Sequence, residues 1–213
     1  MVKIFLIIIF IAVGLSNSAF AQTGYGTDIS GIIAIPTGIN SEIYNTGFGG
    51  LAGFYYDVDE KIRIALVLGF ITLGLDGDEL NKKLEDAGEG NASISGSTNA
   101  IPVIISFRLI TTGTNMRFYG LLEAGIYTYW SKAQGTYFPG DGDVPIDKSE
   151  FRSEPGSSVG GGVLFPLNEE LNLNANLRYT FIQDSEYLNF GTTSVSTSQM
   201  FLFGIGLNWF FLL

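Results

Sequence analysis

The chain of 213 residues contains no cysteine and no histidine. Without cysteine there is no disulfide bond, no thiol nucleophile and no lipid-modified amino-terminal cysteine. Histidine titrates near neutral pH and acts as base or acid in many enzymes. Nothing in the sequence assembles a substitute for it. We therefore expect no catalytic residues, no enzymatic activity and no bound cofactor.

Basic residues are scarce: 11 Lys and Arg stand against 21 Asp and Glu, a formal net charge of −10. A nucleic-acid partner would require clustered cations to neutralise its phosphates, so this balance argues against one. The acidic segment 139–147 invites comparison with a calcium loop. However, Ile146 and Arg152 stand where an EF-hand requires Gly and Glu. We expect a solvated acidic loop and no metal site.

Long apolar runs are also missing. One run of 12 residues, Ile4–Leu15, follows Met1-Val2-Lys3 and precedes the triplet Ala19-Phe20-Ala21. This order is typical of a secretory signal peptide, and a helix of that length spans only about 18 Å of a bilayer core of about 30 Å. We expect a signal peptide over residues 1–21 and one domain over residues 22–213. Since no later segment offers 18 consecutive apolar residues, any membrane-spanning part must be a closed barrel.

What the chain does contain is alternation. In Gln199–Phe211 every second residue is large and apolar, from Phe201 to Phe211, while the residues between them are small or mixed. Leu171–Gln183 repeats the pattern with asparagines and Arg178 on its second face. Transmembrane barrel strands place bulk toward lipid and small or polar residues inside, and aromatic girdles collect at their ends. A soluble barrel of lipocalin type would require the opposite polarity.

Turn signals divide the chain into eight expected strands. They cover residues 27–36, 47–58, 61–74, 99–110, 116–130, 157–165, 171–183 and 199–211. Long connections alternate with short ones, which is the layout of an outer-membrane barrel with both termini at the periplasmic, short-turn end. A short surface helix is expected at Glu79–Ala87. The predicted fold class is all-β: an eight-stranded antiparallel up-and-down transmembrane β-barrel.

With these strands and its ending Gly204–Phe211, the chain resembles the small eight-stranded outer-membrane barrels of Gram-negative bacteria, a group that includes the OmpA barrel domain, OmpX and OmpW. The ending looks like the carboxy-terminal signal that the barrel assembly machinery recognises. The resemblance implies localisation in the outer membrane, with the lipid bilayer and that machinery as partners. We expect a monomer.

The inward-facing residues predict two layers. Charged side chains avoid the lipid face, where they cost about 2–4 kcal/mol at the bilayer midplane. We therefore expect a polar floor in the lumen, with Glu123 paired to Arg117 or Arg178. The floor residues are Arg63, Arg108, Arg117, Glu123 and Arg178. Eight strands leave an interior just wide enough for side chains, which favours a structural role over an ion path.

Above this floor the inward residues are apolar. The candidate lumen pocket comprises Ile71, Leu73, Pro102, Ile104, Met200 and Leu202. Proline cannot donate to a ladder, so Pro102 predicts a local break in its strand. One hypothesis is a lateral gap through which an apolar ligand passes, as the resemblance to OmpW implies. The other is a bulge over a solid core.

Two functions therefore stay open at the level of sequence. The first is a narrow channel or binding barrel for small apolar molecules. The second is a structural or adhesive outer-membrane barrel with a filled lumen and surface-exposed acidic loops. They differ in whether the apolar upper lumen is empty or packed.

Overall fold

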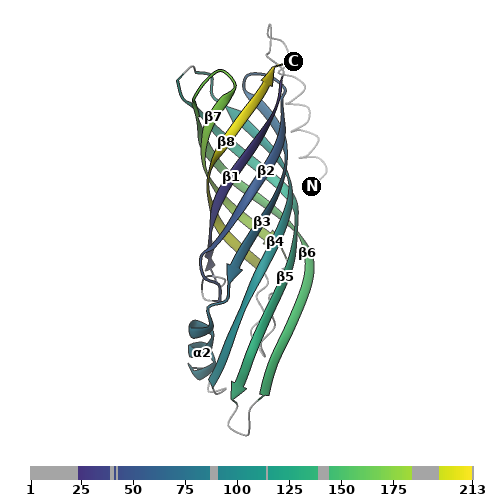
Figure 1. Cartoon of the computed structure of the whole chain (residues 1–213), viewed down its shortest axis with the longest axis vertical. Coiled ribbons are helices and arrows are strands. Elements are labelled where there is room, and N and C mark those ends of the chain that lie inside the picture. The colour runs from purple at the N-terminus through teal and green to yellow at the C-terminus, as the bar shows by residue number, and fades with distance from the viewer. Residues whose placement is uncertain are drawn as a thin grey trace.

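The computed structural model is a closed barrel of eight antiparallel strands (Figure 1). It describes residues 24–38, 41, 43–86, 91–113, 115–138, 144–183 and 197–212, so the expected signal peptide lies outside the described residues. The strands are β1 (Gly24–Thr37), β2 (Gly47–Asp57), β3 (Ile62–Gly74), β4 (Asn91–Ile110), β5 (Arg117–Phe138), β6 (Val144–Pro166), β7 (Leu171–Gln183) and β8 (Thr197–Leu212). Each strand pairs with its neighbours in sequence, and β8 closes the ring by pairing with β1. The predicted fold class is confirmed.

Residues alternate between a buried interior and an exposed exterior along the strands. In β8, Ile205 is 68% exposed although it is apolar, whereas Asn208 is polar and fully buried. This polarity is the reverse of a soluble barrel, since burial of apolar surface is what stabilises a protein in water. A bilayer makes the same exterior favourable. In the described part of the chain, no helix is long and apolar enough to cross a membrane.

Aromatic rings gather at both ends of this apolar exterior. At one end Trp209 stacks with Phe211 at a centroid distance of 5.9 Å, and Tyr25 packs on Phe54 at 5.8 Å. At the other end Tyr179 contacts Phe201 at 4.6 Å. Rings at these two levels form the girdles expected where a barrel meets lipid headgroups.

The short turns lie at one end of the barrel, together with the start of β1 and the end of β8 (Figure 1). Two of them contain the same side-chain-to-backbone hydrogen bonds. In the β2–β3 turn, Asp59 Oδ1 accepts hydrogen bonds from the backbone N–H groups of Lys61 and Ile62 at 2.7 and 2.8 Å. In the β6–β7 turn, Asn168 Oδ1 accepts from Glu170 and Leu171 at 2.9 and 2.8 Å. Such Asx turns satisfy backbone donors locally and hold the strands in register.

At the opposite end, β4, β5 and β6 extend well past the other strands (Figure 1). Pairing between β3 and β4 stops at Gly74↔Ser97, and pairing between β6 and β7 stops at Gly156↔Ile182. Beyond these points β4, β5 and β6 pair only with one another among the described strands. We call this three-stranded extension, residues 91–96, 131–138 and 144–155, the arm.

The arm corrects the sequence-based strand boundaries, which treated residues 75–98 and 131–155 as loops. Its strands carry serine, threonine and charged residues on the outward face, so they lack the apolar alternation that predicts a strand. In the arm, β5 pairs with β4 on one side and with β6 on the other, and these backbone hydrogen bonds keep all three strands extended. The predicted helix is present as α2 (Gly77–Asp86) and packs beside β4.

The side chains of α2 protect one edge of the arm. Asp76 Oδ1 accepts the backbone N–H of Glu79 at 3.1 Å, which caps the helix start. Leu80 is buried in the same cluster as Ile94 of β4. Asn81 Oδ1 accepts the backbone N–H of Ala92 at 2.6 Å, so a side chain satisfies an edge donor of β4.

Candidate functional site

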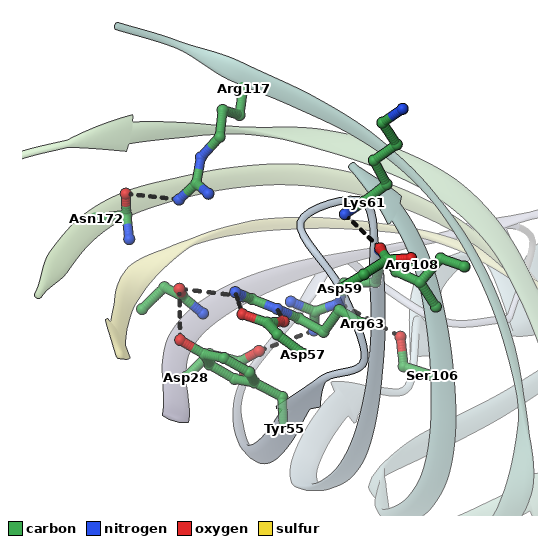
Figure 2. A network of polar contacts seen from close by, with 12 residues as sticks. Asp28, Tyr55, Asp57, Asp59, Lys61, Arg63, Ser106, Arg108, Arg117 and Asn172 are labelled. Atoms are coloured by element: carbon green, nitrogen blue, oxygen red, sulfur yellow. Dashed lines mark hydrogen bonds and ion pairs between the residues drawn. The ribbon is translucent and has the colours of Figure 1, made fainter. Parts of the chain in front are cut away.

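The polar layer of the lumen nearest the short turns is built around Arg63 at the start of β3 (Figure 2). It is the first layer, counted from this end of the barrel toward the arm. Its Nε and Nη2 donate to the two carboxylate oxygens of Asp57 at 2.5 and 2.8 Å, and its Nη1 donates to Asn208 Oδ1 at 3.1 Å. The guanidinium carbon lies 3.5 Å from the ring centroid of Tyr55, whose hydroxyl also donates to Asn208. This bidentate, ring-stacked arginine joins three strands across the barrel interior.

A second layer lies around Arg108 on β4. Its Nη2 donates to Asp28 Oδ2 at 2.8 Å, and both side chains are almost completely buried. The guanidinium also faces the ring of Tyr119 at 5.5 Å, and the Tyr119 hydroxyl donates to Asn174 Oδ1 at 2.7 Å. Because Asp28 is on β1 and Arg108 on β4, this pair spans the lumen.

The third layer pairs Arg178 with Glu123. The Arg178 Nε lies 3.5 Å from Glu123 Oε1, and both side chains are at most 2% exposed. Of the two partners predicted for Glu123, the structure brings Arg178 to it. Arg117 instead lies at the barrel mouth, where its Nη2 donates to Asn172 Oδ1 at 3.3 Å. The five predicted floor residues therefore divide into four inside the lumen and one at its mouth.

Above these layers the predicted pocket residues pack against one another. Ile71, Ile104 and Leu202 are only 1–2% exposed and belong to one apolar cluster. Leu73 and Met200 belong to the same cluster, at 5% and 2%. An exposed fraction this small means that these side chains keep little water-accessible surface.

Pro102 is buried and interrupts one ladder only. The β3–β4 pairs stop at Leu68↔Val103 and resume at Ile71↔Ala100, whereas the β4–β5 ladder passes through Pro102↔Tyr127. The register is the same on both sides of the interruption, so there is no bulge. A Cβ added at Gly69 would meet the side chains of Leu51 and Pro102, which shows that both side chains approach the interruption closely.

A separate cavity of about 710 Å³ opens at the short-turn end. We call it the short-turn cavity. Its bottom is the Arg63–Asp57 pair, and Arg117, Asn172 and Phe210 line its sides. The β2–β3 and β6–β7 turns add acidic side chains at its rim, namely Asp59, Glu60 and Glu169. Within the described residues no group of three acidic side chains has the arrangement of a metal site.

Sequence reasoning missed Asp28 and the short-turn cavity. Asp28 occupies an inward phase of β1, and an acidic residue in an apolar strand was a signal for a buried arginine partner. The cavity could not be read from periodicity, because residues of several turns and strand ends form it.

No protein-family model and no curated protein matches the chain. Solved structures match it in fold. The outer membrane protein OprG from Pseudomonas aeruginosa is 12% identical, with a TM-score of 0.55 over 91% of this chain and 98% of that chain. Neisserial surface protein A is 16% identical, with a TM-score of 0.53 over 88% and 97%. Ail of Yersinia pestis, solved with the heparin analogue sucrose octasulfate, is 13% identical, with a TM-score of 0.51 over 89% and 99%.

At these identities the likeness shows the fold. It is the fold of small eight-stranded outer-membrane barrels, as the resemblance in sequence pattern predicted.

Proposed function

We propose that this chain is a non-conducting outer-membrane barrel that presents the arm as a binding surface outside the cell. The packed upper lumen carries the proposal. Ile71, Ile104 and Leu202 keep almost no water-accessible surface, and the ion pairs of Asp57, Asp28 and Glu123 lie in the lumen between them and the short turns. A solute path would have to break both layers.

The orientation follows from barrel construction. Outer-membrane barrels carry short turns on the periplasmic side and longer segments outside. Here the arm and α2 lie at the end of the barrel opposite the short turns (Figure 1). The signal peptide expected over residues 1–21 and the assembly signal expected at Gly204–Phe211 agree with this route to the membrane. We propose that the barrel is a monomer in the bilayer.

The surface of the arm is suited to a polar partner. Its outward face bears Ser93, Ser95, Lys132 and Gln134, all exposed. On the β6 side, residues 146–154 lie between Pro145 and Pro155 and pair only with β5 among the described strands. An edge of this kind can add a strand from a partner, while its prolines and charges limit indiscriminate pairing.

The acidic residues around α2, beside the arm, favour a basic partner over a polyanion. The segment around α2 carries Asp76, Asp78, Glu79, Glu85 and Asp86 against Lys82 and Lys83. Ail was solved with a sulfated heparin analogue. The acidic α2 region of this chain would repel such a ligand, so we do not extend that ligand to it.

Two measurements test the proposal. In planar bilayers we expect no stepwise conductance from the wild-type protein, and in vesicles we expect apolar solutes to enter at the rate of protein-free controls. Ile104→Arg places a charge in the apolar upper lumen, and we expect it to change neither the conductance nor the rate of solute entry. Wild-type uptake above the control, abolished by this variant, would instead support the narrow channel for small apolar molecules.

The role of the arm is tested by shortening it. Lys132 and Ser149 are paired, so residues 133–148 can be replaced by an Asn-Gly turn, which suits a two-residue hairpin. The replacement removes Asp141, Asp143 and Asp147 together with Lys148 and leaves the acidic residues of α2 in place. We therefore expect this variant in nanodiscs to lose part of the retention that the wild type shows on a polylysine surface, with neither retained on heparin. Equal retention of the two proteins on polylysine would exclude the arm as the binding surface. Lys148→Gln with the arm intact is the matched control.

A further inference from the structure

The short-turn cavity holds an arginine without a carboxylate partner. Among the described residues, Arg63, Arg108, Arg152 and Arg178 each form an ion pair, whereas Arg117 donates to the amide oxygen of Asn172 at 3.3 Å. Arg117 is only partly exposed, and the cavity it lines also contains Arg63, whose charge Asp57 already balances. A half-buried guanidinium in this position is stabilised by an anion.

The surroundings of Arg117 restrict which anion fits. Asn172 contacts the guanidinium, and Asn168 lines the same cavity, so both can offer an amide group to a ligand. Asn168 Oδ1 is already engaged by the β6–β7 turn, and Asn172 Oδ1 by Arg117, so their amide nitrogens remain as donors. A planar carboxylate matches the fork of an arginine and two neighbouring N–H groups.

The acidic side chains at the rim determine which other charged groups the ligand can carry. Glu60 and Glu169 are exposed at the opening, and Asp59 uses one oxygen to hold its turn. These carboxylates repel a ligand with several negative charges and attract one that also carries an amine. The apolar side chains of Ile110, Pro166 and Phe210 offer contact to a short aliphatic portion. The cavity volume of about 710 Å³ lies within the range of small-ligand sites.

We propose that the short-turn cavity binds the carboxy-terminal end of a short peptide that also carries an amine, with the carboxylate on Arg117 and the amine toward Glu60 and Glu169. The closed floor makes this a binding site at the end of the barrel, separate from the arm at the other end. The site would sample peptides on the short-turn side of the membrane.

The test uses the full-length protein in nanodiscs and three probes. They are the tripeptide lysyl-alanyl-alanine, its carboxy-terminal amide, and glutamyl-alanyl-alanine. Calorimetric titration should give a Kd for the first probe on the order of 0.1–1 mM. We expect binding at least about tenfold weaker for the amide, which corresponds to loss of about 1.4 kcal/mol, and several-fold weaker for the glutamyl peptide.

Variants assign the effect to the cavity. Arg117→Gln should weaken binding of the lysyl peptide about tenfold, so that the peptide and its carboxy-terminal amide bind with similar affinity. Arg152→Gln on the arm should leave both affinities unchanged. Glu60→Gln with Glu169→Gln should bring the lysyl and glutamyl peptides to similar affinity. A faster-migrating unboiled band on a gel verifies that each variant is folded. Equal binding of the acid and amide probes, unchanged binding by Arg117→Gln, or no heat from the lysyl peptide would overturn the proposal.

Discussion

At the scale of single residues, the lumen is held by arginines whose charges are matched one by one. The pair Arg108–Asp28 is almost fully buried, whereas the pair Arg152–Glu150 on the arm is about one-third exposed. Removing one member of a buried pair leaves an uncompensated charge, but an exposed pair is screened by water. The two pairs therefore allow a direct comparison of the same chemistry at two depths.

Asp28→Asn keeps the shape of the side chain and removes its charge. We expect it to lower the free energy of unfolding by about 3–5 kcal/mol, since Arg108 then stays buried without a counter-ion. Glu150→Gln, the matched change on the arm, should cost less than about 1 kcal/mol. Urea unfolding in vesicles, followed by tryptophan fluorescence, measures both. Similar costs for the two variants would contradict this account of the buried layer.

Two glycines of β1 make a second residue-scale test. A Cβ at Gly26 would collide with the ring of Tyr55, the residue that stacks on Arg63. A Cβ at Gly31 would meet nothing within 4 Å. We expect Gly26→Ala to destabilise the barrel by about 1–3 kcal/mol through overpacking, and Gly31→Ala to be neutral or slightly stabilising. The same unfolding assay distinguishes them, and a cost at Gly31 equal to that at Gly26 would refute the packing argument.

At the scale of elements, the β3–β4 ladder contains the interruption at Pro102. Because proline has no N–H group, the neighbouring positions Gly69 and Phe70 lack their regular cross-strand pairs. The missing donor leaves the β3 carbonyl opposite Pro102 without its cross-strand hydrogen bond. Pro102→Ala supplies this donor, and we expect the new amide at position 102 to exchange with deuterium within about tenfold of the rate of the Val67 amide, as one cross-strand hydrogen bond of about 0.5–1.5 kcal/mol implies. Exchange at position 102 as fast as in an exposed loop would show that the two strands stay apart without the proline.

The elements also mark what sequence could and could not predict. Strands with strong alternation, such as Leu171–Gln183 and the segment ending at Phe211, were predicted within a few residues, because lipid on one side and a packed lumen on the other leave a clear pattern. The arm was missed because water reaches much of its surface and apolar alternation is lost. Pro102 was predicted to break its strand, and the interruption is real but confined to one ladder without a bulge.

The sequence predicted which arginines lie in the lumen, but not which carboxylate each of them contacts. Inward phase alone placed Arg63, Arg108 and Arg178 in the lumen. Which carboxylate each arginine meets depends on the registers of all eight strands, and Asp28 reaches Arg108 from a strand three positions away in the ring. Whether the apolar layer is empty or packed depends on side-chain volumes and rotamers, which an alternation pattern does not contain.

At the scale of the whole molecule, the two ends of the barrel face different compartments under the proposed orientation. The chain has no cysteine, so single cysteines can report on each end. Ser149→Cys on the arm should react in intact cells with a membrane-impermeant maleimide, whereas Glu169→Cys in the β6–β7 turn should react only after the outer membrane is permeabilised. Both positions are exposed in the structure. Labelling of Glu169→Cys in intact cells would invert the orientation.

Closure of the ring by β8 has a consequence for biogenesis. β1 and β8 join the two extremes of the described chain, with Gly24 opposite Leu212, so the barrel has a high contact order. A ribosome releases the closing strand last, and until it arrives both β1 and β7 expose unpaired edges that lipid cannot solvate. The chain therefore cannot insert strand by strand as it is synthesised. It must be kept unfolded until the whole polypeptide is available, and a chain truncated before Thr197 should be degraded or aggregate instead of forming a smaller barrel.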